Sequence, residues 1–372
     1  MSIAQYCFPQ KTFFGSGCVQ KLAEELPKDG KLLIVAGKRA SESESAQKIL
    51  DRLAPRTAAL YQKVPAEPPL DCVDEIIALG REKNVQAVAA IGGGSVMDAA
   101  KAAAALIPLD GSVSDYFRGE KSIPGKGLFF AAAPTTAGTG AEATSNAVLT
   151  DPETKIKKSL RHPGMMADLA LIDPELTLST PPALTAASGL DAFVQAFESY
   201  TSPRATALTR TLSAEAVRKI FNSLVPTFRE PDNLLFRTEM AEGSMLSGLA
   251  FAQTGLGAVH GIAHPVGSLL GVPHGIACAT LMLPVMRFNA AVCGDRYAEL
   301  ASCCGEKPEA EAFLRAAEEL FRNLGGTPNL RAFHFGKEHF DFIVKNCRSA
   351  SMKQNPRPMS DSDVVAILEQ LL

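Results

Sequence analysis

The feature that most constrains this chain is the run Gly92-Gly93-Gly94-Ser95, which separates an apolar stretch from an alanine-rich one. Residues 85–91 are apolar and short enough for a buried parallel strand, and residues 96–106 are rich in strong helix formers. Glycines let the backbone approach a ligand closely, and free amides at a helix N-terminus attract an anion. The run therefore predicts a phosphate-binding turn. The alternative is an ordinary strand-to-helix turn, with Ser95 as its N-cap and Asp98 closing a capping box.

Strands alternate with helices on both sides of this turn. Stretches 31–35, 57–61, 128–133 and 169–174 predict strands, with helices over 45–53 and 71–83. This alternation is typical of a doubly wound parallel sheet, in which ligands bind at the carboxyl ends of the strands. Gly37, the glycine turn and the loop that begins at Thr135 all follow predicted strands, so we expect them at one edge of the sheet.

The loop after the strand 128–133 is rich in small polar residues. Residues 134–145 contain four threonines, two glycines and one serine. Hydroxyls and backbone amides at this density suit contacts to a phosphate or a ribose. The alternative is a flexible surface loop.

The pattern changes at Pro181-Pro182. Almost everything that follows predicts helix, over about 183–201, 204–224, 233–254, 256–269, 275–290, 308–325, 337–347 and 361–372. A chain of 372 residues is long enough for two domains. We therefore expect an α/β domain over residues 1–180 and an all-helical domain over residues 181–372.

Composition narrows the class of protein. Apolar residues make up 46% and charged residues 21%, as in ordinary globular proteins, and the net charge of −3 provides no basic surface for nucleic acid. No apolar run of transmembrane length and no secretory signal is evident, so we expect a cytoplasmic protein without membrane or nucleic-acid partners. The eight cysteines form no C-x-x-C pair and are expected to be small core residues; adjacent Cys303 and Cys304 are the alternative as metal ligands.

Polar residues at helical spacing mark the second half. His260 and His264 are four residues apart, as are Asp191 and Gln195, so each pair shares one helix face. His274 stands at a turn into a further helix. An ionised Asp in an apolar helix is costly unless it is paired or bound to a cation. These residues predict either a divalent metal site or a hydrogen-bonded set of helix-packing side chains. His162, His334 and His339 are expected at the surface.

Taken together, these motifs resemble the iron-containing (group III) alcohol dehydrogenase family. The matching segments run in the family's order over roughly residues 8 to 276: Phe14-Gly15-Ser16-Gly17, Gly92-Gly93-Gly94-Ser95-x-x-Asp98, Pro134 to Gly140, Asp173-Pro174-Glu175-Leu176, Gly189-x-Asp191-Ala192, His260-x-x-x-His264-Pro265 and Pro273-His274-Gly275.

The resemblance implies a Rossmann-like domain followed by a helical domain, with NAD(P) and a divalent metal, Fe²⁺ or Zn²⁺, as cofactors. It also implies a homodimer. It assigns the metal to Asp191, His260 and His274, with Gln195 at the position of a further ligand, and makes His260 and His264 catalytic, His264 as a proton relay. It assigns the cofactor to Gly92, Gly93, Gly94, Ser95, Asp98, Thr135, Thr136 and Thr139, with Lys157 and Leu184 beside the nicotinamide. Family members that favour NAD often have Asp where this chain has Gly37, which is followed by Lys38 and Arg39, so the resemblance favours NADP.

Gln195 departs from the family pattern. Iron-dependent members have a metal-binding His at this position, and an amide oxygen is a weaker ligand for iron or zinc. Related glycerol dehydrogenases hold zinc with one Asp and two His. We therefore expect a metal site that is partly empty as purified.

The function expected from the resemblance is reversible, metal-assisted hydride transfer between a nicotinamide and a small alcohol or aldehyde. Two alternatives stay open at this point. One is a metal-independent reductase of the maleylacetate reductase type, and the other is a dehydroquinate synthase-like lyase.

Overall fold

A computed structural model describes residues 4–41, 43–326 and 330–372. The chain divides into two compact units. The first comprises the residues up to Thr180 together with Asp232–Ala241, and the second comprises Pro181–Pro231 and Glu242–Leu372. Residues 232–241 therefore group with the first unit, although the sequence pattern places them within the helical half.

The first unit is built on a parallel sheet, as predicted for an α/β fold. Among the described residues this sheet has six strands in the order β1-β8-β5-β4-β2-β3, and every pairing is parallel. The strands are β1 (Lys11–Phe14), β2 (Leu32–Ala36), β3 (Thr57–Tyr61), β4 (Ala87–Gly92), β5 (Phe129–Pro134) and β8 (Leu169–Ile172).

Strand β1 was not expected from the sequence. It is four residues long, is largely exposed, and pairs with β8 from Lys11 opposite Leu169 to Phe14 opposite Ile172. A short edge strand has little burial and so carries no clear alternation of apolar and polar residues. Its existence depends on the backbone of β8, which is distant in sequence.

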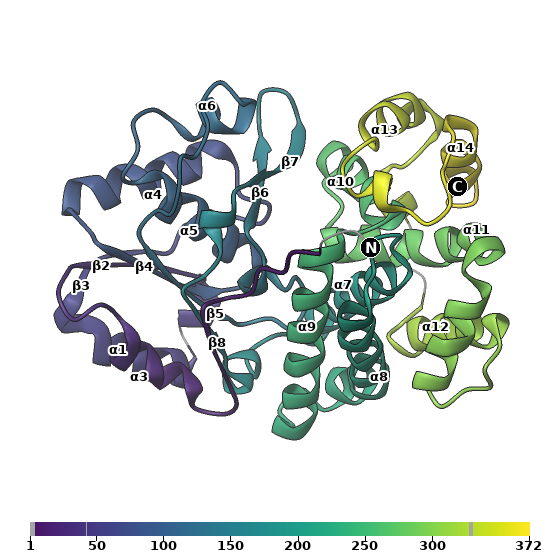
Figure 1. The fold of residues 1–372 in the computed structure, drawn as a ribbon, viewed down its shortest axis with the longest axis horizontal. Coiled ribbons are helices and arrows are strands. Elements are labelled where there is room, and N and C mark those ends of the chain that lie inside the picture. The colour runs from purple at the N-terminus through teal and green to yellow at the C-terminus, as the bar shows by residue number, and fades with distance from the viewer. Residues whose placement is uncertain (1–3, 42, 327–329) are drawn as a thin grey trace. The chain divides into compact units, whose positions relative to one another are not determined.

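Helices cover both faces of the sheet (Figure 1). Successive side chains of a strand point to opposite faces, so the apolar strands contribute side chains to two separate hydrophobic cores, one on each face of the sheet. Leu33 and Val35 of β2 pack with α4 (Leu70–Lys83) and α5 (Gly94–Leu106), whereas Leu32 and Ile34 pack with α3 (Glu44–Leu53). Burial on both faces is the physical reason that these strands read as continuous apolar runs.

Smaller elements complete the first unit. They are α1 (Leu22–Glu25), α2 (Lys38–Ser41), α6 (Val113–Arg118), and the antiparallel hairpin of β6 (Asn146–Asp151) and β7 (Ile156–Arg161). Short 3₁₀ helices occur in both units, at Cys18–Lys21, Ala54–Arg56, Ala141–Ala143, Pro163–Met165, Pro174–Thr177, Leu330–Phe333, Lys337–His339 and Met352–Gln354.

The second unit is helical in its described residues, as predicted. Its helices are α7 (Pro182–Thr201), α8 (Ala207–Arg229), the C-terminal part of α9 (Leu234–Thr254), α10 (Ala258–Leu270), α11 (His274–Cys303), α12 (Ala310–Asn323), α13 (Phe340–Asn346) and α14 (Asp361–Glu369). Helix α11 is longer than the predicted 275–290 and continues through Pro284. A buried stripe of Val285, Asn289, Cys293 and Tyr297 runs on past this proline, so packing outweighs the hydrogen bond that the proline removes.

Helix α11 also tests the expectation that no segment has transmembrane character. By length and hydropathy alone, α11 is long and apolar enough to cross a membrane, contrary to the expectation from the sequence. However, 56% of its apolar stretch is buried within the protein, as in the core helix of a globular domain. This helix is weak evidence for a membrane span.

Candidate metal and nucleotide sites

A glycine at the start of α11 brings that helix close to α7. A Cβ added to Gly275 would lie 2.3 Å from the backbone oxygen of Ala187, a distance that no side chain tolerates. The close approach places His274, the first residue of α11, near Asp191, which lies one turn after Ala187 on α7. The Oδ1 atom of Asp191 is 3.8 Å from Nε2 of His274. His274 thus supplies one possible metal ligand, and the missing side chain of Gly275 lets α11 approach α7 closely enough for His274 to reach Asp191.

A buried carboxylate on α7 orients the second histidine. Glu198 accepts hydrogen bonds of 2.8 Å from the backbone N–H groups of Gly257 and Val259, at the N-terminus of α10. The same carboxylate lies 2.7 Å from Nδ1 of His260, whose Nε2 is 3.1 Å from Oδ1 of Asp191. An ionised Glu198 accepts only, so it holds the proton on Nδ1 and directs Nε2 of His260 toward Asp191.

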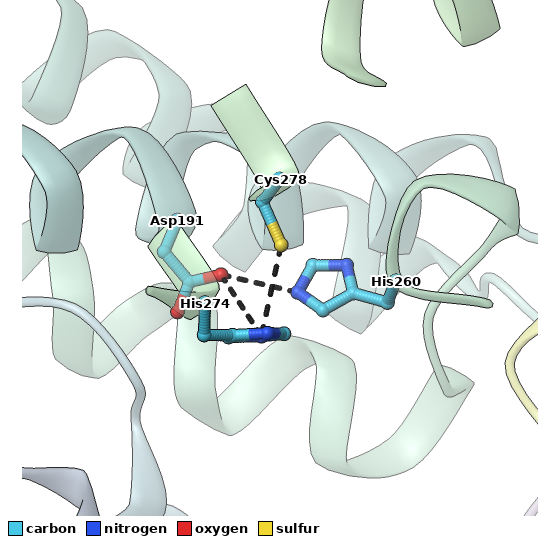
Figure 2. A group of neighbouring side chains, drawn as sticks. All are labelled: Asp191, His260, His274 and Cys278. Atoms are coloured by element: carbon cyan, nitrogen blue, oxygen red, sulfur yellow. Dashed lines mark hydrogen bonds and ion pairs between the residues drawn. The ribbon is translucent and has the colours of Figure 1, made fainter. Parts of the chain in front are cut away.

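Three helices thus bring four possible metal ligands together: Asp191, His260, His274 and Cys278 (Figure 2). One ligand atom from each residue lies within 4.8 Å of the others, and Sγ of Cys278 is 3.6 Å from Nε2 of His274. Asp191, His260 and Cys278 are buried and His274 is partly buried. Of these, the sequence predicted Asp191, His260 and His274 and placed Cys278 in the core.

Charge and spacing both suit a cation here. Burial by itself would lower the pKa of His260, but the neighbouring Cys278 and Glu198 and the hydrogen bond to Asp191 hold it well above its ordinary value. The surroundings of Asp191 therefore favour a positive charge. Two ligands about 2.0 Å from a tetrahedral ion lie about 3.3 Å apart. The 3.1 Å and 3.8 Å separations of Asp191 from the two imidazoles match this spacing, so the residues fit a divalent metal.

Gln195 lies beside the group. Its Nε2 donates a 2.9 Å hydrogen bond to Oδ2 of Asp191, the oxygen that does not face the histidines in these contacts. Its Oε1 is buried and has no hydrogen-bond partner among the described residues. Gln195 is thus adjacent to the site and its assignment as a metal ligand remains a prediction. The ring of His264 lies 5.4 Å, centre to centre, from that of His274.

In the first unit, the glycine turn packs against the threonine loop. A Cβ on Gly94 would lie 2.6 Å from Thr139, and one on Gly93 would lie 3.4 Å from Thr136. The N–H of Thr135 donates a 2.9 Å hydrogen bond to the carbonyl of Gly92. The two segments that were predicted separately to contact a nucleotide are therefore neighbours. Close packing against the threonine loop also explains why Gly94 has no side chain.

The alternative, a capping box with Ser95 as N-cap and Asp98 closing it, is wrong. Helix α5 begins at Gly94, with Gly93 as its N-cap. The hydroxyl of Ser95 instead accepts a hydrogen bond from the N–H of Glu67, and Oδ2 of Asp98 accepts one from the N–H of Val148. Both side chains therefore connect α5 to other segments and leave the first amides of the helix uncapped by a side chain.

Of the remaining predicted cofactor residues, Lys157 and Gly37 lie near the glycine turn, and Leu184 belongs to the second unit. Lys157 forms a 2.8 Å ion pair with Glu67, the residue that also contacts Ser95. The N–H of Gly37 donates to the carbonyl of Ile91, so Gly37 lies beside the end of β4, next to the glycine turn. Leu184 belongs to the second unit, in the first turn of α7, and is 46% exposed.

The sequence pattern did not single out Cys278, which lies in the group of possible metal ligands, or Glu198, which contacts His260. Cys278 follows His274 by four residues, the same spacing that singled out His260 and His264. Glu198 follows Asp191 by seven residues, so it shares a helix face with Asp191 and is a second acidic residue in an apolar helix. Both signals are present in the printed sequence.

Comparison with known proteins finds two family models that together match almost the whole chain. Residues 9–174 match the model of a family described as iron-containing alcohol dehydrogenase. Residues 185–372 match the C-terminal model of the Fe-containing alcohol dehydrogenase family.

Individual relatives are similar over nearly their full length. Long-chain-alcohol dehydrogenase 1 of Geobacillus thermodenitrificans is 33% identical, over 99% of this chain and 97% of that protein. Lactaldehyde reductase of Escherichia coli strain K12 is 33% identical, over 96% of this chain and 97% of that protein. The solved structure of sulfoacetaldehyde reductase from Bifidobacterium kashiwanohense in complex with NAD⁺ superposes with a TM-score of 0.92 at 29% identity, covering 100% of this chain and 99% of that one.

Proposed function

The chain belongs to the iron-containing alcohol dehydrogenase family and is an oxidoreductase that acts on alcohols, and from this premise we propose its reaction and the residues that carry it. The reaction is reversible hydride transfer between a nicotinamide and the carbon that bears the hydroxyl of a small alcohol, with release of one proton in the direction of aldehyde formation. The observation that carries this proposal is the convergence of Asp191, His260 and His274 in one largely buried group.

We assign the metal to Asp191, His260 and His274. A divalent ion held by these residues would supply Lewis-acid chemistry toward the carbonyl of the substrate. Asp191 contributes negative charge, and the two imidazoles contribute neutral nitrogen ligands. Glu198 positions His260 by accepting a hydrogen bond from its Nδ1–H group, since Nδ1 and Oε2 are 2.7 Å apart. Glu198 is thus a positioning residue for the site.

His264 is proposed as the proton relay. Its ring lies beside that of His274, on the same helix as His260 and one turn further along. An imidazole has a pKa near neutrality, which suits it to take the proton that alcohol oxidation releases. It is partly buried, whereas His260 is fully buried.

We propose that the pyrophosphate of the cofactor binds at the glycine turn. The free amides at the N-terminus of α5 attract negative charge, and Thr135, Thr136 and Thr139 lie against the same turn. Asp98 and Lys157 are proposed to border the cofactor from α5 and β7. Leu184 is proposed to contact the nicotinamide.

The coenzyme is proposed to be NADP in preference to NAD. No acidic side chain stands at Gly37 to repel a 2′-phosphate, and the exposed cations Lys38 and Arg39 follow it directly. The test is kcat/KM for NADPH and for NADH with one aldehyde, measured for the native protein and for the double variant Lys38→Ala, Arg39→Ala. A higher kcat/KM for NADH in the native protein contradicts this preference.

Localisation and oligomeric state are proposed from the same resemblance to the family. We propose a cytoplasmic homodimer, and light scattering of the purified protein tests the dimer directly.

The experiment that tests the function is a panel of small alcohols and aldehydes, assayed by nicotinamide absorbance. Each assay uses protein stripped of metal and then loaded with Fe²⁺ or Zn²⁺. Net turnover of nicotinamide that requires metal is the expected result. Activity that persists without metal would favour a metal-independent reductase, and conversion without net nicotinamide turnover would favour a lyase.

A further inference from the structure

Resting on the metal site proposed above, we infer that Cys278 is a direct metal ligand. Its thiolate occupies the coordination position for which Gln195 is the other candidate. The site is then Asp-His-His-Cys, and its metal is Zn²⁺ in preference to Fe²⁺.

The position of the thiol supports this inference. Cys278 lies one turn after His274 on α11, so both side chains project from one face toward Asp191 and His260 (Figure 2). Its sulfur is 3.6 Å from Nε2 of His274 and within 4.8 Å of a ring nitrogen of His260. In a tetrahedral zinc site, a sulfur at about 2.3 Å and a nitrogen at about 2.0 Å from the ion lie about 3.5 Å apart. The thiol therefore has the spacing of a ligand toward His274.

The side chain of Gln195, the other candidate for this coordination position, forms a hydrogen bond to Asp191. Its amide nitrogen donates to Oδ2 of Asp191, which keeps the carboxylate oriented while Oδ1 faces both histidines. Exchanging the amide oxygen and nitrogen would set Oε1 against a carboxylate oxygen, with no proton between them. The hydrogen bond thus assigns Gln195 to holding Asp191.

The chemistry of the donors selects the metal. Thiolate is a soft ligand that favours zinc, and a metal ion displaces the thiol proton when it binds. Asp191 and a Cys278 thiolate together carry two negative charges, which balance a divalent cation. Zinc also accepts a fifth ligand, so a thiolate in the shell does not close the site to substrate.

The test is the ultraviolet absorption of the full-length protein loaded with Co²⁺ in place of its own metal. A cobalt–thiolate bond gives a charge-transfer band that oxygen and nitrogen ligands do not give. We expect this band in the native protein and its loss in Cys278→Ser with Co²⁺ still bound. Cys293→Ser is the matched control, because Cys293 is also buried in α11 but lies outside the ligand group, and it should keep the band.

X-ray absorption of the native zinc-loaded protein provides a readout that requires no variant. One sulfur at about 2.3 Å from zinc is expected. A shell of oxygen and nitrogen alone would overturn the inference and favour Gln195, while leaving the proposed metal function intact. Failure of the native protein to bind Co²⁺ or Zn²⁺ at all would overturn both proposals.

Discussion

Replacing Glu198 by Gln tests how much the metal centre depends on a residue that does not touch the metal. The carboxylate is 3% exposed and accepts three hydrogen bonds, from Gly257, Val259 and His260. A glutamine has one acceptor oxygen and one NH₂ donor in the same space. If the oxygen keeps Gly257 and His260, the NH₂ group must face the N–H of Val259, so at least one buried donor loses its partner.

The magnitude follows from these contacts. One buried donor left without a partner costs about 1–3 kcal/mol of stability. Loss of a carboxylate behind a metal-binding histidine lowers metal affinity about 10–100-fold. Glu198→Gln should therefore lower both the unfolding free energy of the metal-free protein and its zinc affinity, whereas a residue that only caps α10 would affect the first quantity alone.

The assays are urea unfolding of the metal-free protein and zinc titration in competition with a coloured chelator. Glu299→Gln is the control, since Glu299 is an exposed residue of the same unit. Its carboxylate accepts a hydrogen bond from the hydroxyl of Tyr200, and it is not one of the four possible metal ligands. Zinc affinity of Glu198→Gln equal to that of the native protein would refute the assignment of Glu198 as the residue that orients His260.

Three further predictions address the same structure. His274→Ala should lose bound metal and activity together, each by more than about 100-fold, beyond the range of outer-shell changes, whereas His339→Ala should retain both in metal analysis and steady-state assays. Gln195→His removes the hydrogen bond to Asp191 and adds no ligand where Cys278 already stands, so it should not raise the metal retained after dialysis, measured by elemental analysis, and it should cost about 1 kcal/mol of stability for the larger ring. Burial lowers the pKa of Lys101 from 10.5 to about 8, so between these values the unfolded chain binds more protons and stability should rise with pH; Lys101→Met should abolish this rise in thermal unfolding.

Each of these predictions has a contrary result. Metal retained by His274→Ala would remove that residue from the metal site. More metal retained by Gln195→His than by the native protein would show that residue 195 faces the ion. A pH dependence of stability that is unchanged in Lys101→Met would mean that Lys101, which donates to Ala141, Thr144 and Asn146, titrates near its ordinary pKa.

Much of the fold was accessible from the sequence because its signals are local. A strand buried on both faces reads as an apolar run, and the glycine turn after β4 marks the start of α5. The spacing of His260 and His264 gives one helix face without any knowledge of neighbours. These patterns predicted the parallel sheet, the helical second half and three of the four residues that form the group of possible metal ligands.

The tertiary structure decided what depends on contacts between distant segments. Strand β1 exists because β8 offers it a free edge, and α11 continues through Pro284 because its far half is buried. Cys278 is an ordinary core cysteine until α7 and α10 bring Asp191 and His260 to the same point. A side chain's chemistry is set by the groups that surround it. For this cysteine those groups include Asp191 and His260, which are 69 residues apart in sequence, and no local pattern encodes contacts over such a separation.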